Sequence, residues 1–129
     1  MASPDRTAHT TGQILAAFGI DVVLVVVFAA VGRASHDEAP ISGLATTAGP
    51  FAAALVVGWI VSLAWRSPQA VVRTGIPVWI VTVAGGMILR AVTGQGVQVA
   101  FVIVAASVLL LMIVGWRVAA TLVARRRAR

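Results

Sequence analysis

The sequence predicts an all-α fold: an integral membrane four-helix bundle, arranged as two antiparallel transmembrane hairpins. Of its 129 residues, 60% are hydrophobic and 11% are charged, whereas soluble domains average about 25% charged residues. So few polar side chains could not cover a soluble domain of this size. Four apolar stretches also reach the roughly 20 residues that a spanning helix needs. One transmembrane domain over residues 1–129 is therefore predicted.

The predicted spans cover residues 13–32, 44–65, 74–92 and 97–122, and a short basic cytoplasmic tail follows at 123–129. A cleaved signal peptide is the alternative for the first stretch. Its apolar run extends from Ile14 to Val31, which is longer than the about 7–15 apolar residues of a signal peptide. Asp21 also interrupts the run, so a retained span is favoured.

Prolines bear on the residues at which the second and third predicted helices begin. Pro50 lies inside the second apolar stretch, and proline has no N–H for the helical hydrogen-bond ladder. The regular part of the second helix is therefore expected to begin at Pro50, with 44–49 irregular or loosely helical. Ser67 followed by Pro68 is typical of a helix N-terminus. Either a short interfacial helix over 68–73 precedes the third span, or that span is kinked at Pro77.

The arginines predict the orientation, because cytoplasmic flanks carry the excess of basic residues. One side of the spans has only Arg33 and Arg90, and the other has eight arginines: Arg6, Arg66, Arg73, Arg117, Arg125, Arg126, Arg127 and Arg129. Trp65, Trp79 and Trp116 fall toward the more basic side, where indole rings favour the membrane interface. We therefore expect a multi-pass protein of the cell membrane with both termini cytoplasmic.

Composition excludes several classes of function. The net charge is +6, but the arginines cluster at the ends of apolar runs, which fits membrane orientation and anionic lipid better than nucleic acid. The chain has no cysteine, which rules out disulfides, thiolate metal sites, iron–sulfur clusters and covalently attached c-type haem. No nucleophile motif, phosphate-binding glycine loop or metal-ligand spacing is present. An enzyme is therefore not expected.

Asp21 is the acidic residue that lies inside a predicted span. It is roughly 12 Å from the inner end of the first helix, at 1.5 Å per residue. A carboxylate at that depth costs on the order of 2.5–3.5 kcal/mol, so it should face the bundle and have a partner. Arg117, about a turn inside the cytoplasmic end of the fourth span, is the candidate. The two form either a structural ion pair or a protonatable site that couples a proton to a substrate.

An external polar cluster is predicted on the opposite side, from Arg33, His36 and Arg90. His36, Asp37 and Glu38 are potential metal ligands, but three consecutive residues rarely converge on one ion, so a solvated loop and no metal are expected. Arg33 and Arg90 end neighbouring spans on the same side. They either bind an anion or a lipid headgroup or only extend their side chains to the interface.

The basic tail is defined by Arg125, Arg126, Arg127 and Arg129. Basic clusters next to a transmembrane helix bind anionic lipid with about 1 kcal/mol per residue. The tail is therefore expected to contact membrane lipids and to fix the topology. A docking site for a partner is the alternative.

Polar, aromatic and glycine positions form an ordered pattern through all four predicted spans: Asp21, Phe28, Gly32, Arg33, His36, Pro50, Phe51, Gly58, Trp59, Trp65, Trp79, Gly86, Met87, Leu89, Arg90, Gly94, Gly96, Phe101, Val104, Ala105, Gly115, Trp116 and Arg117. In this pattern the chain resembles the DUF3054 family of uncharacterised small multi-pass membrane proteins. The likeness covers nearly the whole chain. It implies a small four-span membrane protein, and it brings no activity, substrate or cofactor.

Two functions remain open from the sequence. The first is a structural or accessory membrane subunit without catalytic activity. The alternative is a small proton-coupled transporter or permease that acts as a homo-oligomer through Asp21. About 129 residues leave little room for a substrate cavity in one protomer, so a homo-oligomer or a partner membrane subunit is expected in either case. No cofactor is predicted.

Overall fold

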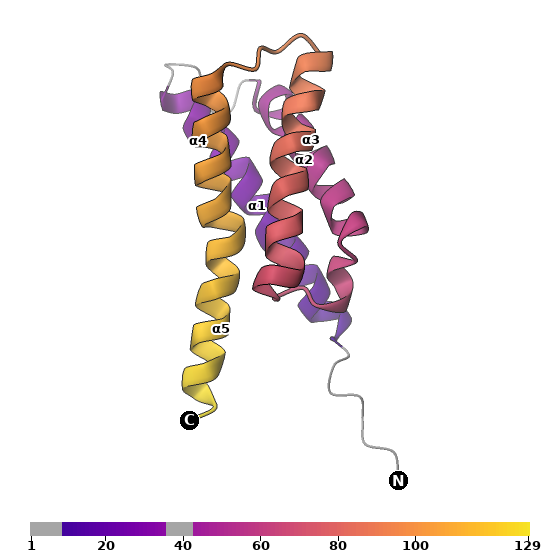
Figure 1. Cartoon of the computed structure of the whole chain (residues 1–129), viewed down its shortest axis with the longest axis vertical. Helices are drawn as coiled ribbons and strands as arrows, with labels where there is room; N and C mark the ends of the chain where they lie inside the picture. The colour runs from indigo at the N-terminus through magenta and orange to yellow at the C-terminus, as the bar shows by residue number, and fades with distance from the viewer. Residues whose placement is uncertain (1–8, 36–42) are drawn as a thin grey trace.

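The computed structural model describes residues 9–35 and 43–129 and forms a helical bundle (Figure 1). Its helices are α1 (Thr11–Ser35), α2 (Leu44–Val61), α3 (Ile76–Val92), α4 (Val99–Leu109) and α5 (Gly115–Arg127). A π-helical turn, Val71–Gly75, leads into α3, and a second, Leu110–Val114, joins α4 to α5. Over these described ranges there is no strand. The all-α prediction is confirmed.

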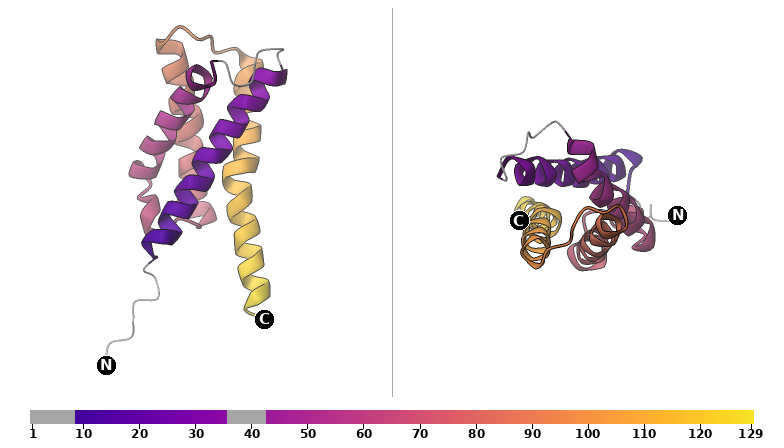
Figure 2. Two further views of the ribbon diagram at one scale, coloured as in Figure 1. Left: turned by 180° about the vertical axis from the view of Figure 1, so that it is seen from behind. Right: turned by 90° about the horizontal axis from the view of Figure 1, so that it is seen from above.

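Four helical segments are long and apolar enough to cross a membrane: Thr11–Ala34, Leu44–Val61, Val71–Val92 and Val99–Arg127. The fourth of these is one continuous rod built from α4, the π-turn and α5 (Figure 2). Successive segments alternate in direction, so α1 begins and α5 ends at the same end of the bundle. We call this the terminal end, and the opposite end the loop end.

Most of the bundle interior is apolar, and all four segments contribute to it. The fully or nearly buried side chains include Val25 and Phe28 of α1, Phe51, Leu55 and Trp59 of α2, Val78 of α3, and Leu109 and Ile113 of the fourth segment. Large apolar side chains also cover the outside, among them Leu111, exposed for 74% of its surface. An apolar exterior of this extent is typical of a surface that faces lipid.

Helices α2 and α3 approach each other closely because small residues lie between them. A Cβ added at Gly58 would lie 3.3 Å from the Val78 carbonyl oxygen, and one at Gly86 would overlap the Phe51 ring. The Phe51 ring in turn packs edge-on against Phe28 of α1, at 5.4 Å between centroids. Close approach through small residues is the usual way that membrane helices gain packing energy.

The expectation that the regular part of α2 begins at Pro50 is wrong. The helix begins at Leu44 and contains Pro50. Proline leaves the carbonyl four residues earlier without its intrahelical donor, and that carbonyl belongs to Thr46. The side chain of Gln95, from the connection between α3 and α4, donates its Nε2–H to the Thr46 oxygen at 3.1 Å. A neighbouring loop thus replaces the missing hydrogen bond and lets the helix continue through the proline.

The connection between α2 and α3 differs from the first of the two predicted alternatives, the short interfacial helix over 68–73. Helix α2 ends at Val61, before a 3-10 turn at Ala64–Arg66 and the π-turn at Val71–Gly75. No separate helix covers 68–73, and Pro77 comes directly after the π-turn, at the second position of α3. The Thr74 hydroxyl closes the connection by donating to the Ser67 carbonyl at 2.6 Å.

The fourth helical segment continues past residue 122, because α5 ends at Arg127. Most of the basic tail at 123–129 is therefore helical.

Candidate functional site

The structure brings Asp21 and Arg117 together near the terminal end of the bundle. Neither side chain has any exposed surface. The guanidinium of Arg117 binds both carboxylate oxygens, with Nη1 donating to Oδ1 at 2.9 Å and Nη2 donating to Oδ2 at 2.7 Å. This two-point geometry is the strongest arrangement of an arginine and a carboxylate. It joins the first helix of the chain to the last.

Two tryptophans complete the surroundings of the Asp21 carboxylate. Trp59 Nε1 donates to Oδ2 at 2.8 Å, and Trp116 Nε1 donates to Oδ1 at 2.9 Å. A carboxylate has room for about four hydrogen bonds, and these two indoles with the two guanidinium nitrogens supply four. The donors come from α2 and α5, and Asp21 itself belongs to α1. Hydrogen bonds from two helices thus offset the burial of the charge, and the contacts join three helices.

Arg117 is also held by backbone groups outside its ion pair. Its Nε donates to the Pro68 carbonyl and its Nη1 to the Ile113 carbonyl, both at 2.9 Å. Its Cζ lies 4.6 Å from the centre of the Trp116 ring, within range of a cation–π interaction. The side chain therefore ties the connection between α2 and α3 to the pair.

Both π-turns adjoin the Arg117 side chain. One contains Ile113, whose carbonyl accepts its hydrogen bond, and the other contains Gly75, where an added Cβ would lie 3.1 Å from Arg117 Cδ. Single π-turns in α-helices are enriched at functional sites. Here the absence of a side chain at Gly75 leaves the space through which the Arg117 stem passes.

The hydrogen-bond partners that the structure gives Asp21 are all nitrogen donors of the protein itself. No hydroxyl or thiol nucleophile contacts Asp21 among its recorded partners. Within residues 9–35 and 43–129, no three His, Asp or Glu side chains lie together as metal ligands would. We call Asp21, Trp59, Trp116 and Arg117 the buried network.

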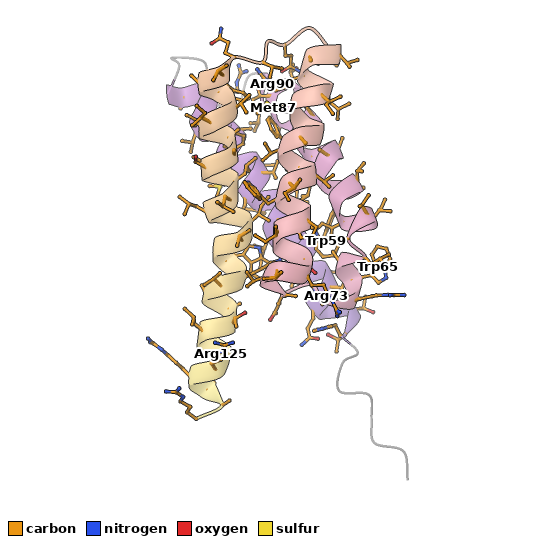
Figure 3. The ribbon with its side chains drawn as sticks, viewed as in Figure 1. Trp59, Trp65, Arg73, Met87, Arg90 and Arg125 are labelled. Atoms are coloured by element: carbon orange, nitrogen blue, oxygen red, sulfur yellow. The ribbon has the colours of Figure 1, made fainter. Side chains whose placement is uncertain are left out.

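The two outer arginines lie at the loop end, and both contact neighbouring elements. Arg33 Nη1 donates to the Thr47 hydroxyl at 3.0 Å. Arg90 donates through Nη1 to Gln95 Oε1 at 3.1 Å and through Nε and Nη2 to the Gly96 carbonyl at 3.3 and 3.2 Å. Figure 3 shows Arg90 at this end and Arg125 at the other.

Arg33 and Arg90 line one cavity of about 540 Å³. Its remaining walls are Phe28, Ala29 and Gly32 of α1, Thr46 and Thr47 of α2, Gln95, Gly96 and Gln98 of the connection between α3 and α4, and Ala100, Phe101 and Val104 of α4. The cavity is thus bounded by all four segments. We call it the outer cavity.

The remaining predicted site residues are His36 and the arginines of the basic tail. His36, with Asp37 and Glu38, lies outside the described residues. Of the predicted external cluster, the structure therefore describes only Arg33 and Arg90. Arg125, Arg126 and Arg127 form the last turn of α5, and Arg129 follows it, exposed at the terminal end. Figure 3 shows Arg125 directed away from the bundle.

Sequence reasoning missed the tryptophans of the buried network. Trp116 was assigned to the membrane interface, yet its indole N–H points to Asp21, and the Trp79 N–H donates inward to the Ala106 carbonyl at 2.9 Å. The one available signal was position: Trp59 lies deep in its span, where an indole N–H needs a partner inside the protein. The role of Gln95 had no sequence signal.

The pattern of these residues matches a known family. The sequence model of the family described as "Protein of unknown function (DUF3054)" matches residues 18–120. The chain belongs to the DUF3054 family. The DUF3054 match includes the whole buried network and both outer arginines, and it confirms the predicted membership. No curated protein and no solved structure matches the chain.

Proposed function

We propose that this DUF3054 protein acts without catalysis, as a structural or accessory subunit of the cell membrane that associates with a partner membrane protein or with copies of itself. The observation that carries the proposal is the buried network. Every recorded partner of Asp21 is a donor from the protein's own Arg117, Trp59 or Trp116. In this proposal the charge of Asp21 serves to hold α1, α2 and α5 together.

A proton-coupled transporter working through Asp21 is less well supported. Coupling requires that both a proton and a substrate reach the carboxylate. Asp21 is fully buried, and the outer cavity does not include it among its walls. Breaking the two-point contact with Arg117 would leave both charges unpaired in the interior, which is strongly unfavourable.

The proposal is tested by native mass spectrometry of the protein extracted gently from its source membrane. The expected result is a second membrane protein at fixed stoichiometry. The Asp21→Asn variant is expected to keep that association in spite of lower stability, because the exposed surfaces do not change. A homodimer without a partner, combined with proton-linked flux that Asp21→Asn abolishes, would instead support the transporter.

We further propose that the four segments form two antiparallel hairpins with both ends in the cytoplasm. The chain has no cysteine, so single thiols report sidedness without background. Val97→Cys, in the connection between α3 and α4, is expected to react with a membrane-impermeant maleimide in intact cells. Ala128→Cys, after α5, is expected to react only once the membrane is permeabilised. Labelling of Ala128→Cys in intact cells would reverse the orientation.

A further inference from the structure

The outer cavity combines charged and apolar walls at different depths. Arg33 and Arg90 lie near the ends of α1 and α3 at the loop end. Phe28 precedes Arg33 by five residues, so its backbone lies about 7.5 Å deeper in the bundle at 1.5 Å per residue. A volume of about 540 Å³ is within the usual range for small-molecule sites. The cavity is therefore polar at its outer level and apolar below.

The two guanidinium groups are positioned by the start of α2 and by the connection between α3 and α4. Arg33 bonds to the Thr47 hydroxyl of α2. Arg90 bonds to Gln95 and to the Gly96 carbonyl, and the Gln95 amide in turn donates to the Thr46 carbonyl at 3.1 Å. Arginine presents a planar fork of N–H groups that matches the oxygens of a phosphate. Two such groups on one cavity favour a phosphate or a similar anion.

The lower wall of the cavity is aromatic and reaches the outside of the bundle. Arg90 Cζ lies 4.3 Å from the centre of the Phe101 ring, and the Phe101 and Phe28 centroids are 6.4 Å apart. Val104, also in the wall, is exposed for 54% of its surface. An apolar chain could therefore run from below the arginines to the surface that faces lipid. A free inorganic anion bound to the arginines would not use this apolar wall, whereas a lipid would contact both.

We propose that the outer cavity binds an anionic lipid, with its phosphate on Arg33 and Arg90 and the first part of its acyl chains against Phe28, Phe101 and Val104. This site is separate from the buried network and does not depend on the accessory function. It also differs from the binding expected of the basic tail, which requires only anionic charge at a membrane surface.

The full-length protein in a neutral detergent tests the proposal by titration with dihexanoyl phosphatidic acid, followed by native mass spectrometry. Binding is expected to saturate at one lipid per chain. Arg33→Gln and Arg90→Gln are each expected to weaken it by roughly tenfold or more, the usual size of a lost charge-assisted hydrogen bond. Arg66→Gln and Arg73→Gln, exposed arginines of the terminal end, are the matched controls and are expected to bind normally.

A cavity-filling variant tests the apolar half without touching either arginine. A Cβ at Gly32 would meet no atom within 4 Å, and Gly32 lines the cavity, so Gly32→Leu should fold and occupy the space of the acyl chain. Binding of the lipid is expected to be lost. Gly19→Leu is the control on the same helix, because a Cβ there also meets nothing within 4 Å.

Two comparison ligands separate the possible sources of affinity. Inorganic phosphate and dihexanoylglycerol are each expected to bind far more weakly than the phosphatidic acid. Equal binding of inorganic phosphate would reduce the cavity to a free-anion site, and equal binding of dihexanoylglycerol would leave the arginines without a role. Either result, or unchanged binding in both arginine variants, would overturn the proposal.

Discussion

Replacing Arg117 with methionine is expected to lower the free energy of unfolding by about 3–5 kcal/mol, the usual effect of removing one partner of a buried ion pair. Methionine fills much of the space of the arginine stem but leaves the Asp21 charge with only its two indole donors. The hydrogen bonds from Arg117 to the carbonyls of Pro68 and Ile113 are lost as well. The connection between α2 and α3 should therefore loosen together with the pair.

Denaturant unfolding in detergent micelles measures this effect, with tryptophan fluorescence as the readout. Trp59 and Trp116 both donate to Asp21, so their emission reports directly on the network. Arg125→Met, an exposed residue of the same helix, is the control and should unfold like the parent. The double variant Asp21→Asn with Arg117→Met is expected to be more stable than Arg117→Met alone, because it removes the unpaired charge. Parental stability of Arg117→Met would contradict the assignment.

Replacing Gly86 with alanine is expected to destabilise the bundle by about 1–3 kcal/mol, the typical cost of overpacking a close-packed interior. The added methyl group would overlap the Phe51 ring. That ring cannot move freely, because it packs against Phe28 at 5.4 Å and Phe101 at 6.2 Å between centroids. Helices α2 and α3 must therefore separate, or Phe51 must displace both neighbours.

The same unfolding measurement tests this prediction against a matched glycine. Gly19→Ala is also a substitution inside a helix, but a Cβ there meets nothing within 4 Å. Alanine is the better helix former by about 0.5–1 kcal/mol, so Gly19→Ala should leave stability unchanged or raise it slightly. If Gly86→Ala behaved in the same way, the close approach of α2 and α3 would not be set by this residue.

The sequence predicted the four spans well because their signal is a simple property of long apolar runs. It predicted Asp21 as a residue in need of a partner for an equally direct reason, the high cost of a carboxylate in a membrane. Arg117 followed from depth alone, since Arg33 and Arg90 lie at the opposite end of the spans. Depth along an axis can be read from residue counts.

Side-chain direction and backbone irregularity could not be predicted in this way. Trp59 and Trp116 meet at Asp21 because of how α2 and α5 are rotated against α1, and an apolar span carries little rotational signal. Helix α2 continues through Pro50 with a hydrogen bond from Gln95 to the Thr46 carbonyl, and these two residues lie 49 positions apart in the sequence. The π-turns at Val71–Gly75 and Leu110–Val114 both adjoin the Arg117 side chain, and no local sequence pattern marks either of them.

The link between α1 and α5 also constrains the order of events during synthesis. The Arg117 side chain lies 96 positions after Asp21, so at about 5–20 residues per second the ribosome needs roughly 5–20 s to supply it. Until then the Asp21 carboxylate has no counter-ion, at a cost on the order of 2.5–3.5 kcal/mol in lipid. Until the last helix arrives, the first one is therefore held in the bilayer by its apolar length alone, and the ion pair fixes its place in the bundle only afterwards. A nascent chain that stops before Trp116 leaves the Asp21 carboxylate with Trp59 as the one remaining donor of its buried network.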